Sequence, residues 1–415
     1  MTESKLKHIS IDDLTPGMYV VGVDVPWYRT PFLSHKRLID DTTVIDTMRR
    51  CGIRTVTIDP RKGKDVAGKP SSDGSDGQDE KDAAASDSIG ATSLDQADSA
   101  SAFYIAAEEA IERMFDQLMQ GGPPPSAVAK AAVANIMRWI LNDREAMMTQ
   151  LAVRKIKRFD HSLTAHALDT CILSLAVSVE YGLDQDAQTL LGTGALLHDA
   201  GYLRLPRNLV RNRHECTGQE RALLEQHPRL GITVLAECDD VHDEVKRIVA
   251  EHHERMDGSG FPEGRRGLDI SRLAQIVGIV DWYDGMVSRR GGRPAMLPND
   301  AVRRLFLSGK EGRFDAALIE TTVRIVGVYP IGSLVLLNTG EQAIVVGLNP
   351  EARLKPKVLV IKGPRGEAYP RPHPVDLAAP SGGEAVPVIA RALDPAHEFV
   401  NIALYLDDVT LEAAS

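Results

Sequence analysis

The sequence predicts a mainly α-helical protein, in which an all-helical bundle follows a small α/β module and precedes a small β-rich appendage. Two patterns carry this prediction. Apolar residues recur at helical spacing over 154–328, and short alternating runs rich in valine and leucine lie before and after that region. No segment repeats at a period of about 20 to 50 residues, which argues against a solenoid.

Residues 1–60 are predicted to form the N-terminal α/β module. The run GMYVVGVDVPW (17–27) alternates in the manner of a strand, and RTVTID (54–59) is typical of a second, shorter strand. Between them, TTVIDTMRRCGI (42–53) indicates a helix. Its apolar face contains Val44, Ile45 and Met48.

From 61 to 102 the composition changes to glycine, serine and aspartate, as in GKPSSDGSDGQDEKDAAASDS. Because almost nothing there can be buried, we expect a disordered acidic linker. An amphipathic helix is expected over 103–120, and the following GGPPP ends it. Ile111, Phe115 and Leu118 form the apolar face of that helix.

The helical domain is expected to span 103–328, with its core over 154–328 and with breaks at Gly182, near Pro206 and at 258–262. Residues 329–415 contain GSLVLLNTG, QAIVVGLNP and KVLVIKG, which alternate like strands. They are predicted to form the β-rich appendage.

Composition and charge exclude several classes of protein. A formal charge of −10 argues against a partner that is a nucleic-acid polymer, although a local basic pocket can still bind a small phosphate ligand. The four cysteines lie far apart and form no CxxC pair, which is typical of reduced thiols. The start MTESKLKHIS has no apolar signal region, and no window of about 18 uninterrupted apolar residues predicts a membrane span. We therefore expect a cytoplasmic protein.

Eight of the twelve histidines lie between His161 and His253, and acidic residues lie among them. A cluster of histidine and carboxylate without cysteine indicates a catalytic site for iron, manganese, zinc or nickel rather than a structural metal. A single histidine is more simply a surface or core residue. Two doublets, His198-Asp199 and His252-His253, are harder to explain in that way, because adjacent helical side chains point about 100° apart and can reach two metals.

Four segments of the helical region carry a resemblance: LLHDAGYLRLP, EQHPRLG, VAEHHERMDGSGFPEG and DISRLAQIVGIVDWYDGM. Their motifs and order resemble the HD-GYP family of the HD phosphohydrolase superfamily, over about Asp160 to Val328. That family hydrolyses the bacterial messenger cyclic di-GMP at a centre of two or three metals. The N-terminal ISIDDLTPGMYVVGVDVPWYRTPFL (9–33) is similar to an uncharacterised module often fused ahead of HD-GYP domains.

The resemblance implies a set of metal ligands, with Asp199 as the bridge between two metals and His166 preferred over His161. The implied ligands are His166, His198, Asp199, His227, His252, His253 and Asp281. Asp284 is expected to support the site or to pack, and His161, His214 and His242 are assigned to other roles. Members with three metals carry a glutamate where this chain has Ser162, so two divalent metals are expected. The expected metal is iron or manganese, with zinc, nickel or magnesium as alternatives.

The resemblance also implies a substrate-binding loop and a basic segment. The loop DGSGFP supplies Asp257, Gly258, Gly260, Phe261 and Pro262, with Phe261 in place of the family tyrosine. In SRRGGRP (288–294), Arg290 and Arg293 align with basic positions that contact substrate phosphate. A solvated basic loop is the simpler alternative for these two arginines.

The implied reaction is attack by a metal-bridging hydroxide on a phosphodiester, which gives pGpG and, after a second turnover, GMP. His198, Asp199 and Tyr202 are the predicted catalytic residues. The family has lysine where this chain has Tyr202, and a phenol carries no charge at neutral pH. Loss of that cation is worth about 2–4 kcal/mol of transition-state stabilisation. This slows an enzyme but leaves its ligands in place.

Two alternatives to a cyclic di-GMP phosphodiesterase remain. One is a catalytically weak or inactive signalling adaptor that binds cyclic di-GMP or a diguanylate cyclase, which Tyr202, Phe261 and SRRGGRP favour. The other is an HD hydrolase of a different phosphoester, against which the DGSGFP loop argues. A homodimer and other signalling partners are compatible with the sequence. The resemblance to the family implies control of motility and biofilm formation.

Overall fold

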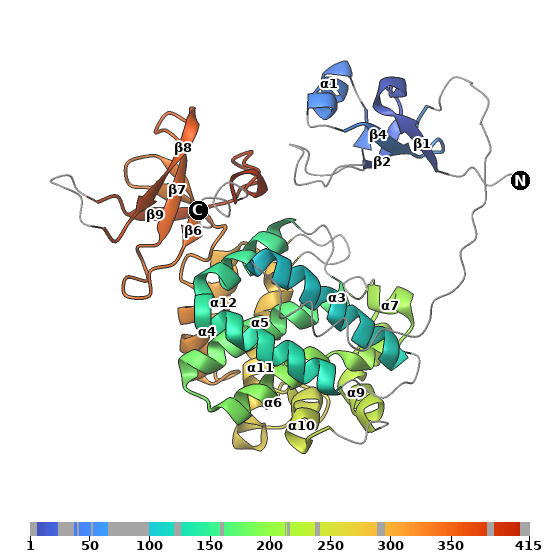
Figure 1. Cartoon of the computed structure of the whole chain (residues 1–415), viewed down its shortest axis with the longest axis vertical. Coiled ribbons are helices and arrows are strands. Elements are labelled where there is room, and N and C mark those ends of the chain that lie inside the picture. The colour runs from blue at the N-terminus through green and yellow to red at the C-terminus, as the bar shows by residue number, and fades with distance from the viewer. Residues whose placement is uncertain are drawn as a thin grey trace, which may run out of the picture. The chain divides into compact units, whose positions relative to one another are not determined.

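The structure, a computed structural model, divides into two units that are described separately: 1–84 together with 399–415, and 85–398 (Figure 1). It describes residues 6–23, 37–39, 41–50, 53–64, 99–119, 126–157, 162–211, 213, 216–236, 241–288, 295–379 and 386–406. Most of the predicted linker lies outside these ranges. The predicted fold class is confirmed, with a small mixed module, a helical region and a terminal antiparallel sheet.

The N-terminal module is a four-stranded sheet with one α-helix among its described residues. The elements are β1 (Lys7–Ser10), η1 (Ile11–Asp13), β2 (Tyr19–Val23), β3 (Arg37–Leu38), α1 (Thr42–Arg50) and β4 (Thr55–Ile58). The strand order is β1-β4-β2-β3, and the neighbouring strands are antiparallel. Ile45 and Met48 of α1 are buried, as the predicted helical face requires.

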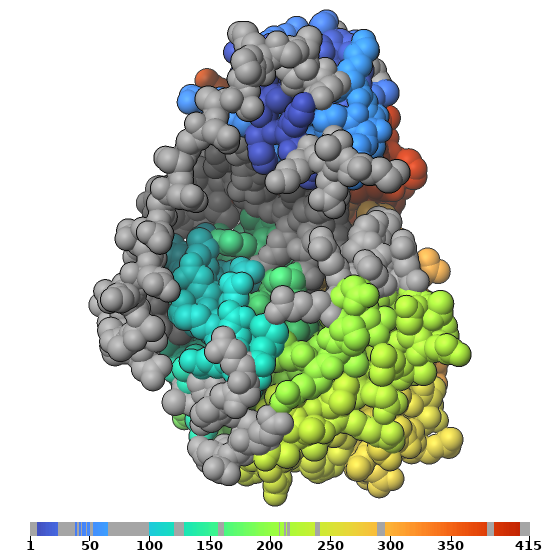
Figure 2. Space-filling model, turned by 90° about the vertical axis from the view of Figure 1, so that its right-hand side faces the viewer, coloured from blue at the N-terminus to red at the C-terminus, as the bar shows by residue number. Residues whose placement is uncertain are grey.

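The second unit is built around a bundle of helices, of which α5 and α11 run through the middle (Figure 1). The elements are α3 (Ala100–Met119), α4 (Ser126–Lys157), α5 (Leu163–Tyr181), α6 (Gln185–Leu197), η3 (Ala200–Arg204), α7 (Arg207–Arg211), α8 (Gly218–Leu224), α9 (His227–Ala236), α10 (Asp243–Glu251), η4 (Gly267–Asp269), α11 (Arg272–Val287), α12 (Pro298–Lys310) and α13 (Ala316–Val326). On the face seen in Figure 2, α3 in cyan and the segment from α7 to α10 in yellow-green form much of the surface of this unit.

Helix α3 belongs to the core of this bundle. It begins at Ala100, three residues earlier than predicted, and Ser99 accepts a hydrogen bond from the backbone N–H of Ala102. Phe103 and Tyr104 are fully buried, and α3 packs on α4, α5 and η3. The helix that follows the linker is therefore part of the same packed body as the metal-ligand candidates.

Helix α5 is the central element, and it contacts α3, α4, α6, α11 and α13. Ser162 caps its first turn by accepting from the N–H of Ala165, and Gly182 ends it in the left-handed region at φ 84°. By length and composition α5 is apolar enough to cross a membrane, but 78% of its most apolar window is buried inside the bundle. It therefore has the character of a core helix.

The C-terminal region is a five-stranded antiparallel sheet of order β8-β7-β6-β5-β9. The strands are β5 (Leu334–Leu337), β6 (Gln342–Gly347), β7 (Lys357–Lys362), β8 (Ala368–Asp376) and β9 (Ile389–Leu393). The first three match the predicted strands, whereas β8 and β9 were not predicted. Strand β8 is a mostly exposed edge strand that contains Pro370, Pro372 and Pro374, so it lacks the buried alternation that marks a strand in a sequence.

Candidate metal centre

All seven side chains predicted as metal ligands converge inside the helical bundle. Most of them lie at helix ends, where a turn of backbone can direct a side chain inward. His198 and Asp199 follow α6, His252 and His253 follow α10, His227 begins α9, His166 lies in the first turn of α5, and Asp281 lies in α11. All but His253 are buried, and His253 is only partly exposed.

Three of the histidines are oriented by the backbone in the same way. In each, Nδ1 donates to the carbonyl oxygen three residues earlier, which lies at the C-terminal end of a helix and needs a donor. The pairs are His198 with Ala195 (2.7 Å), His227 with Leu224 (2.8 Å) and His252 with Val249 (2.9 Å). Since a carbonyl only accepts, the proton is on Nδ1 and Nε2 keeps its lone pair.

The first group consists of His166, His198, Asp199 and Asp281. Nε2 of His166 lies 3.3 Å from Nε2 of His198, 3.5 Å from Oδ2 of Asp199 and 3.0 Å from Oδ1 of Asp281. Nδ1 of His166 donates to Oδ2 of Asp284 at 2.6 Å, so its Nε2 also keeps a lone pair. Asp284 thus supports a candidate ligand, as predicted.

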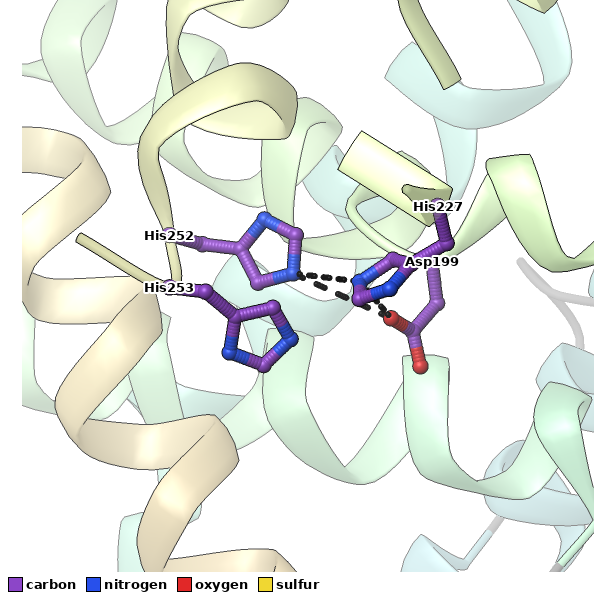
Figure 3. A group of neighbouring side chains, drawn as sticks. All are labelled: Asp199, His227, His252 and His253. Atoms are coloured by element: carbon purple, nitrogen blue, oxygen red, sulfur yellow. Dashed lines mark hydrogen bonds and ion pairs between the residues drawn. The ribbon is translucent and has the colours of Figure 1, made fainter. Parts of the chain in front are cut away.

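The second group consists of Asp199, His227, His252 and His253, drawn in Figure 3. Nε2 of His227 lies 3.2 Å from Nε2 of His252, and Oδ1 of Asp199 lies 3.3 Å and 3.8 Å from these two nitrogens. His252 and His253 enter from one side, and His227 and Asp199 meet them from the other (Figure 3).

Asp199 therefore faces both groups, with Oδ2 toward the first and Oδ1 toward the second. In each group two imidazole lone pairs point at each other across about one hydrogen-bond length, and an unshared pair of this kind is repulsive unless a cation lies between them. The donors of the second group lie within 4.8 Å of one another, and so do those of His166, His198 and Asp199 in the first group. The donor chemistry fits two divalent cations that share one carboxylate.

The region that holds this centre matches a known family. Residues 135–318 match the family described as the HD domain. This part of the chain is an HD domain. Residues 6–128 match a domain of unknown function, DUF3391, and residues 334–397 match a KOW domain associated with HD domain.

Three curated relatives of the chain are named for phosphodiesterase activities of their own. Cyclic di-GMP phosphodiesterase PA4108 of Pseudomonas aeruginosa is 27% identical over 373 residues, which cover 90% of this chain and 89% of that protein. The cyclic di-GMP phosphodiesterase response regulator RpfG of Xanthomonas campestris is 27% identical over 44% of this chain and 49% of that protein. The 3'3'-cGAMP-specific phosphodiesterase 2 of Vibrio cholerae is 28% identical over 34% of this chain and 27% of that protein.

Burial and neighbouring charges set the protonation states of His252, His227 and Asp199. Burial and the neighbouring imidazoles of His198 and His227 lower the pKa of His252 to about 3. Burial also lowers the pKa of His227, against the opposing effect of Asp199. Burial would raise the pKa of Asp199, but the facing imidazoles outweigh it and hold that pKa below its ordinary value. Neutral imidazoles beside an ionised carboxylate are the forms that bind a metal.

These pKa values predict that the metal-free protein loses stability as the pH falls from about 6.5 toward 4. Unfolded histidines take up protons at their ordinary pKa, whereas folded His227 and His252 have lowered pKa values and take them up only at lower pH, so the unfolded state binds more protons. Each such histidine costs about 1.4 kcal/mol of unfolding free energy per pH unit. Urea midpoints of metal-stripped protein at several pH values measure the slope. It should be shallower in His252→Gln and unchanged in His397→Gln, whose ring is exposed; equal slopes in all three proteins would contradict the assignment.

The predicted substrate loop lies against the second group and is fixed by two buried residues that sequence reasoning missed. Both carboxylate oxygens of Glu254 accept backbone N–H groups, from Glu263 at 2.7 Å and Arg265 at 2.9 Å. Arg255 donates to the carbonyl of His252 at 3.0 Å and lies over the ring of Phe314. Two adjacent residues of opposite charge, Glu254 and Arg255, directly after the HH doublet are the signal in the sequence that could have identified them.

Within this loop, the predicted residues have distinct environments. A side chain at Gly260 would lie about 2.5 Å from the backbone of 253–255, so only glycine fits there. Phe261 stacks on His253 with ring centres 4.5 Å apart, and Gly258 adopts φ 79°. Asp257 is exposed and accepts from the N–H of Ser259 at 2.9 Å, while the carbonyl of Pro262 accepts from Arg229.

Tyr202 lies at the edge of the second group. Its ring stacks on His227 with centres 4.1 Å apart and an angle of 19° between the planes. The guanidinium of Arg213 lies 5.2 Å from the centre of the same ring. Tyr202 therefore packs against the candidate ligand His227 and holds the guanidinium of Arg213 nearby.

The remaining predictions fall outside the cluster or outside the described ranges. His242 caps α10 by accepting from the N–H of Glu244, in agreement with its assignment to another role. Arg290 and Arg293, together with His161 and His214, lie outside the described residues. The binding role of the two arginines stays a prediction.

Proposed function

We propose that this chain is a metal-dependent phosphodiesterase that hydrolyses cyclic di-GMP to pGpG, with GMP as the product of a second turnover. The relatives named above include two cyclic di-GMP phosphodiesterases, one of which aligns with 90% of the chain. The HD domain supplies the scaffold. Iron or manganese is the expected metal, and the nitrogen and oxygen donors suit either of them as well as zinc or nickel.

The observation that carries the proposal is the position of Asp199 between two histidine groups. Two bound divalent cations would activate a water and neutralise charge on the phosphodiester. The chain's own residues prepare that chemistry. Backbone carbonyls fix the tautomers of His198, His227 and His252, and the buried carboxylates remain ionised.

The loop of Gly260 and Phe261 supports a planar, base-bearing substrate. The ring of Phe261 stacks on His253 and is only partly buried, so it offers an aromatic surface next to the second group. Aromatic rings of this kind stack on nucleobases with a gain of about 1–3 kcal/mol per base. Arg213 over Tyr202 adds positive charge at the same edge.

The whole chain, stripped of metal and reloaded anaerobically with Mn²⁺ or Fe²⁺, is expected to convert cyclic di-GMP to pGpG. Chromatography of the products measures this conversion. A parallel incubation with 3'3'-cGAMP tests substrate choice, because one relative carries that specificity in its name. Absence of turnover with every metal tested would refute the proposal.

A second candidate, a cyclic di-GMP-binding adaptor without hydrolysis, is favoured by the stacked Tyr202. The two candidates differ in one experiment. If the protein binds the nucleotide tightly but yields no product, and Tyr202→Lys does not restore turnover, the adaptor is correct. If the native protein turns over, Tyr202 is compatible with catalysis and the adaptor is excluded.

A further inference from the structure

A buried charge network extends from the metal centre into α4 and α3, two helices that carry none of the predicted metal ligands. It begins at His166, whose Nδ1 donates to Oδ2 of Asp284 at 2.6 Å. The other oxygen of Asp284 forms an ion pair with Nζ of Lys155, in the last turn of α4. The chain of contacts therefore joins a candidate ligand on α5 to α11 and then to α4.

Lys155 is held from its other side by α5 and α3. Its Nζ lies 3.1 Å from Oδ2 of Asp169, and Oδ1 of Asp169 accepts a hydrogen bond from the hydroxyl of Tyr104. The side chains of Lys155, Asp169 and Asp284 are 8%, 0% and 1% exposed. One ammonium thus lies between two carboxylates in a region almost closed to solvent.

A buried lysine between two carboxylates contributes little net stability to a fold. Burying an ion pair costs several kcal/mol per ion in desolvation, and apolar side chains of similar volume often stabilise a core as well or better. Lys155 also lies among apolar side chains, including Met148, Leu173 and Tyr283. A charge retained in this setting calls for a role that an apolar residue would not fill.

We propose that Lys155 is a positioning residue of the metal centre. It holds Asp284 in the orientation that receives the Nδ1 proton of His166, and so keeps Nε2 of His166 aimed at the first group with its lone pair free. Ligand histidines commonly depend on a carboxylate in this way, and loss of that support costs about 10–100-fold in metal affinity. Here Lys155 in turn supports the carboxylate of Asp284, and Asp169 and Tyr104 hold Lys155 in place.

The arrangement makes the effect selective. The network reaches His166, a member of the first group, whereas the second-group histidines His227 and His252 are oriented by backbone carbonyls. Removing Lys155 should therefore weaken binding at the first group and leave the second group intact. A general loss of folding would lower both affinities together.

The test is calorimetric titration of metal-stripped, full-length protein with Mn²⁺ alone, and it rests on the proposed two-cation site. His198→Gln and His227→Gln assign the two binding steps to the first and second groups. Lys155→Met is expected to weaken the first-group step about 10–100-fold and to leave the second-group step unchanged. Lys130→Met, an exposed lysine on the same helix, is the matched control and should change neither step.

A double-mutant cycle shows whether Lys155 acts through Asp284. In an Asp284→Ala background, Lys155→Met should have no additional effect on the first-group step. In the metal-free protein, NMR of the histidine ring nitrogens should show His166 with the proton on Nδ1 in the native chain and a mixture of tautomers in Lys155→Met. If Lys155→Met does not fold, Tyr104→Phe replaces it, with a smaller weakening of the same step.

Several results would overturn the inference: equal weakening of both steps, a full effect of Lys155→Met in the Asp284→Ala background, or an unchanged first-group step. Failure of the proposed function looks different, because native protein would then bind Mn²⁺ without hydrolysing cyclic di-GMP. Failure of the two-cation site would appear as native protein that binds fewer than two Mn²⁺ ions. Native protein that binds two ions, together with a Lys155→Met variant that binds both equally well, removes only the role of Lys155.

Discussion

Asp199→Asn is expected to abolish binding of at least one metal and to lower the rate of hydrolysis by about a thousandfold or more. The substitution keeps the shape of the side chain but replaces one carboxylate oxygen with an amide nitrogen, which has no lone pair to offer a cation. Since the two oxygens of Asp199 face different histidine groups, whichever oxygen is lost leaves one group without its shared ligand. Metal content of the purified variant and its rate of pGpG formation measure the two effects.

Asp243→Asn is the matched control for this change. Asp243 lies in the first turn of α10 in the same domain, and its side chain is 93% exposed. The control should keep two metals and native activity. Native metal content in Asp199→Asn would show that Asp199 does not bridge the two groups, and the two-cation proposal would then fail.

Gly201→Ala is expected to destabilise the helical unit by about 3 kcal/mol and to displace His227. A Cβ at position 201 would lie 1.8 Å from the carbonyl oxygen of His227 and 2.6 Å from the backbone nitrogen of Gly231. Both atoms belong to the backbone of α9, so no side-chain rotation relieves the contact. Urea unfolding of metal-free protein measures the stability, and Mn²⁺ titration measures the second-group affinity.

Gly218→Ala provides the comparison, because a Cβ at Gly218 meets nothing within 4 Å. At the start of α8 this change should be neutral or should stabilise the protein by up to about 1 kcal/mol. A similar, small effect at Gly201 would mean that η3 and α9 separate easily and that the position of His227 does not depend on their close approach.

Much of the site could be predicted because its residues combine unusual types with helix ends. The doublets His198-Asp199 and His252-His253 terminate apolar runs, and the structure brings both together with His166, His227 and Asp281. Their role as metal ligands stays a prediction. The fold class followed from apolar periodicity, which burial enforces directly.

Lys155 and Asp169 could not be predicted as supporting residues, because nothing local in the sequence marks them. Lys155 lies at the end of a long helix, where the sequence predicts a lysine exposed to solvent. Asp169 lies one turn after His166, in an apolar segment typical of a buried helix. Only the packing of α4 and α11 on α5 brings them together. Strand β8 was missed for a related reason: its prolines argue against a strand, and only its place at the sheet edge permits them.

The packing of α3 has a practical consequence for the isolation of the HD domain. The DUF3391 match runs through residue 128 and so includes α3, whose Phe103 and Tyr104 are fully buried in the bundle. A fragment trimmed at the edge of that match would open a cavity beside α5 and remove the hydroxyl that contacts Asp169. A shortened version that begins just before Ser99 would retain both. The boundary that matters for cloning is set by side-chain packing and precedes the end of the matched region.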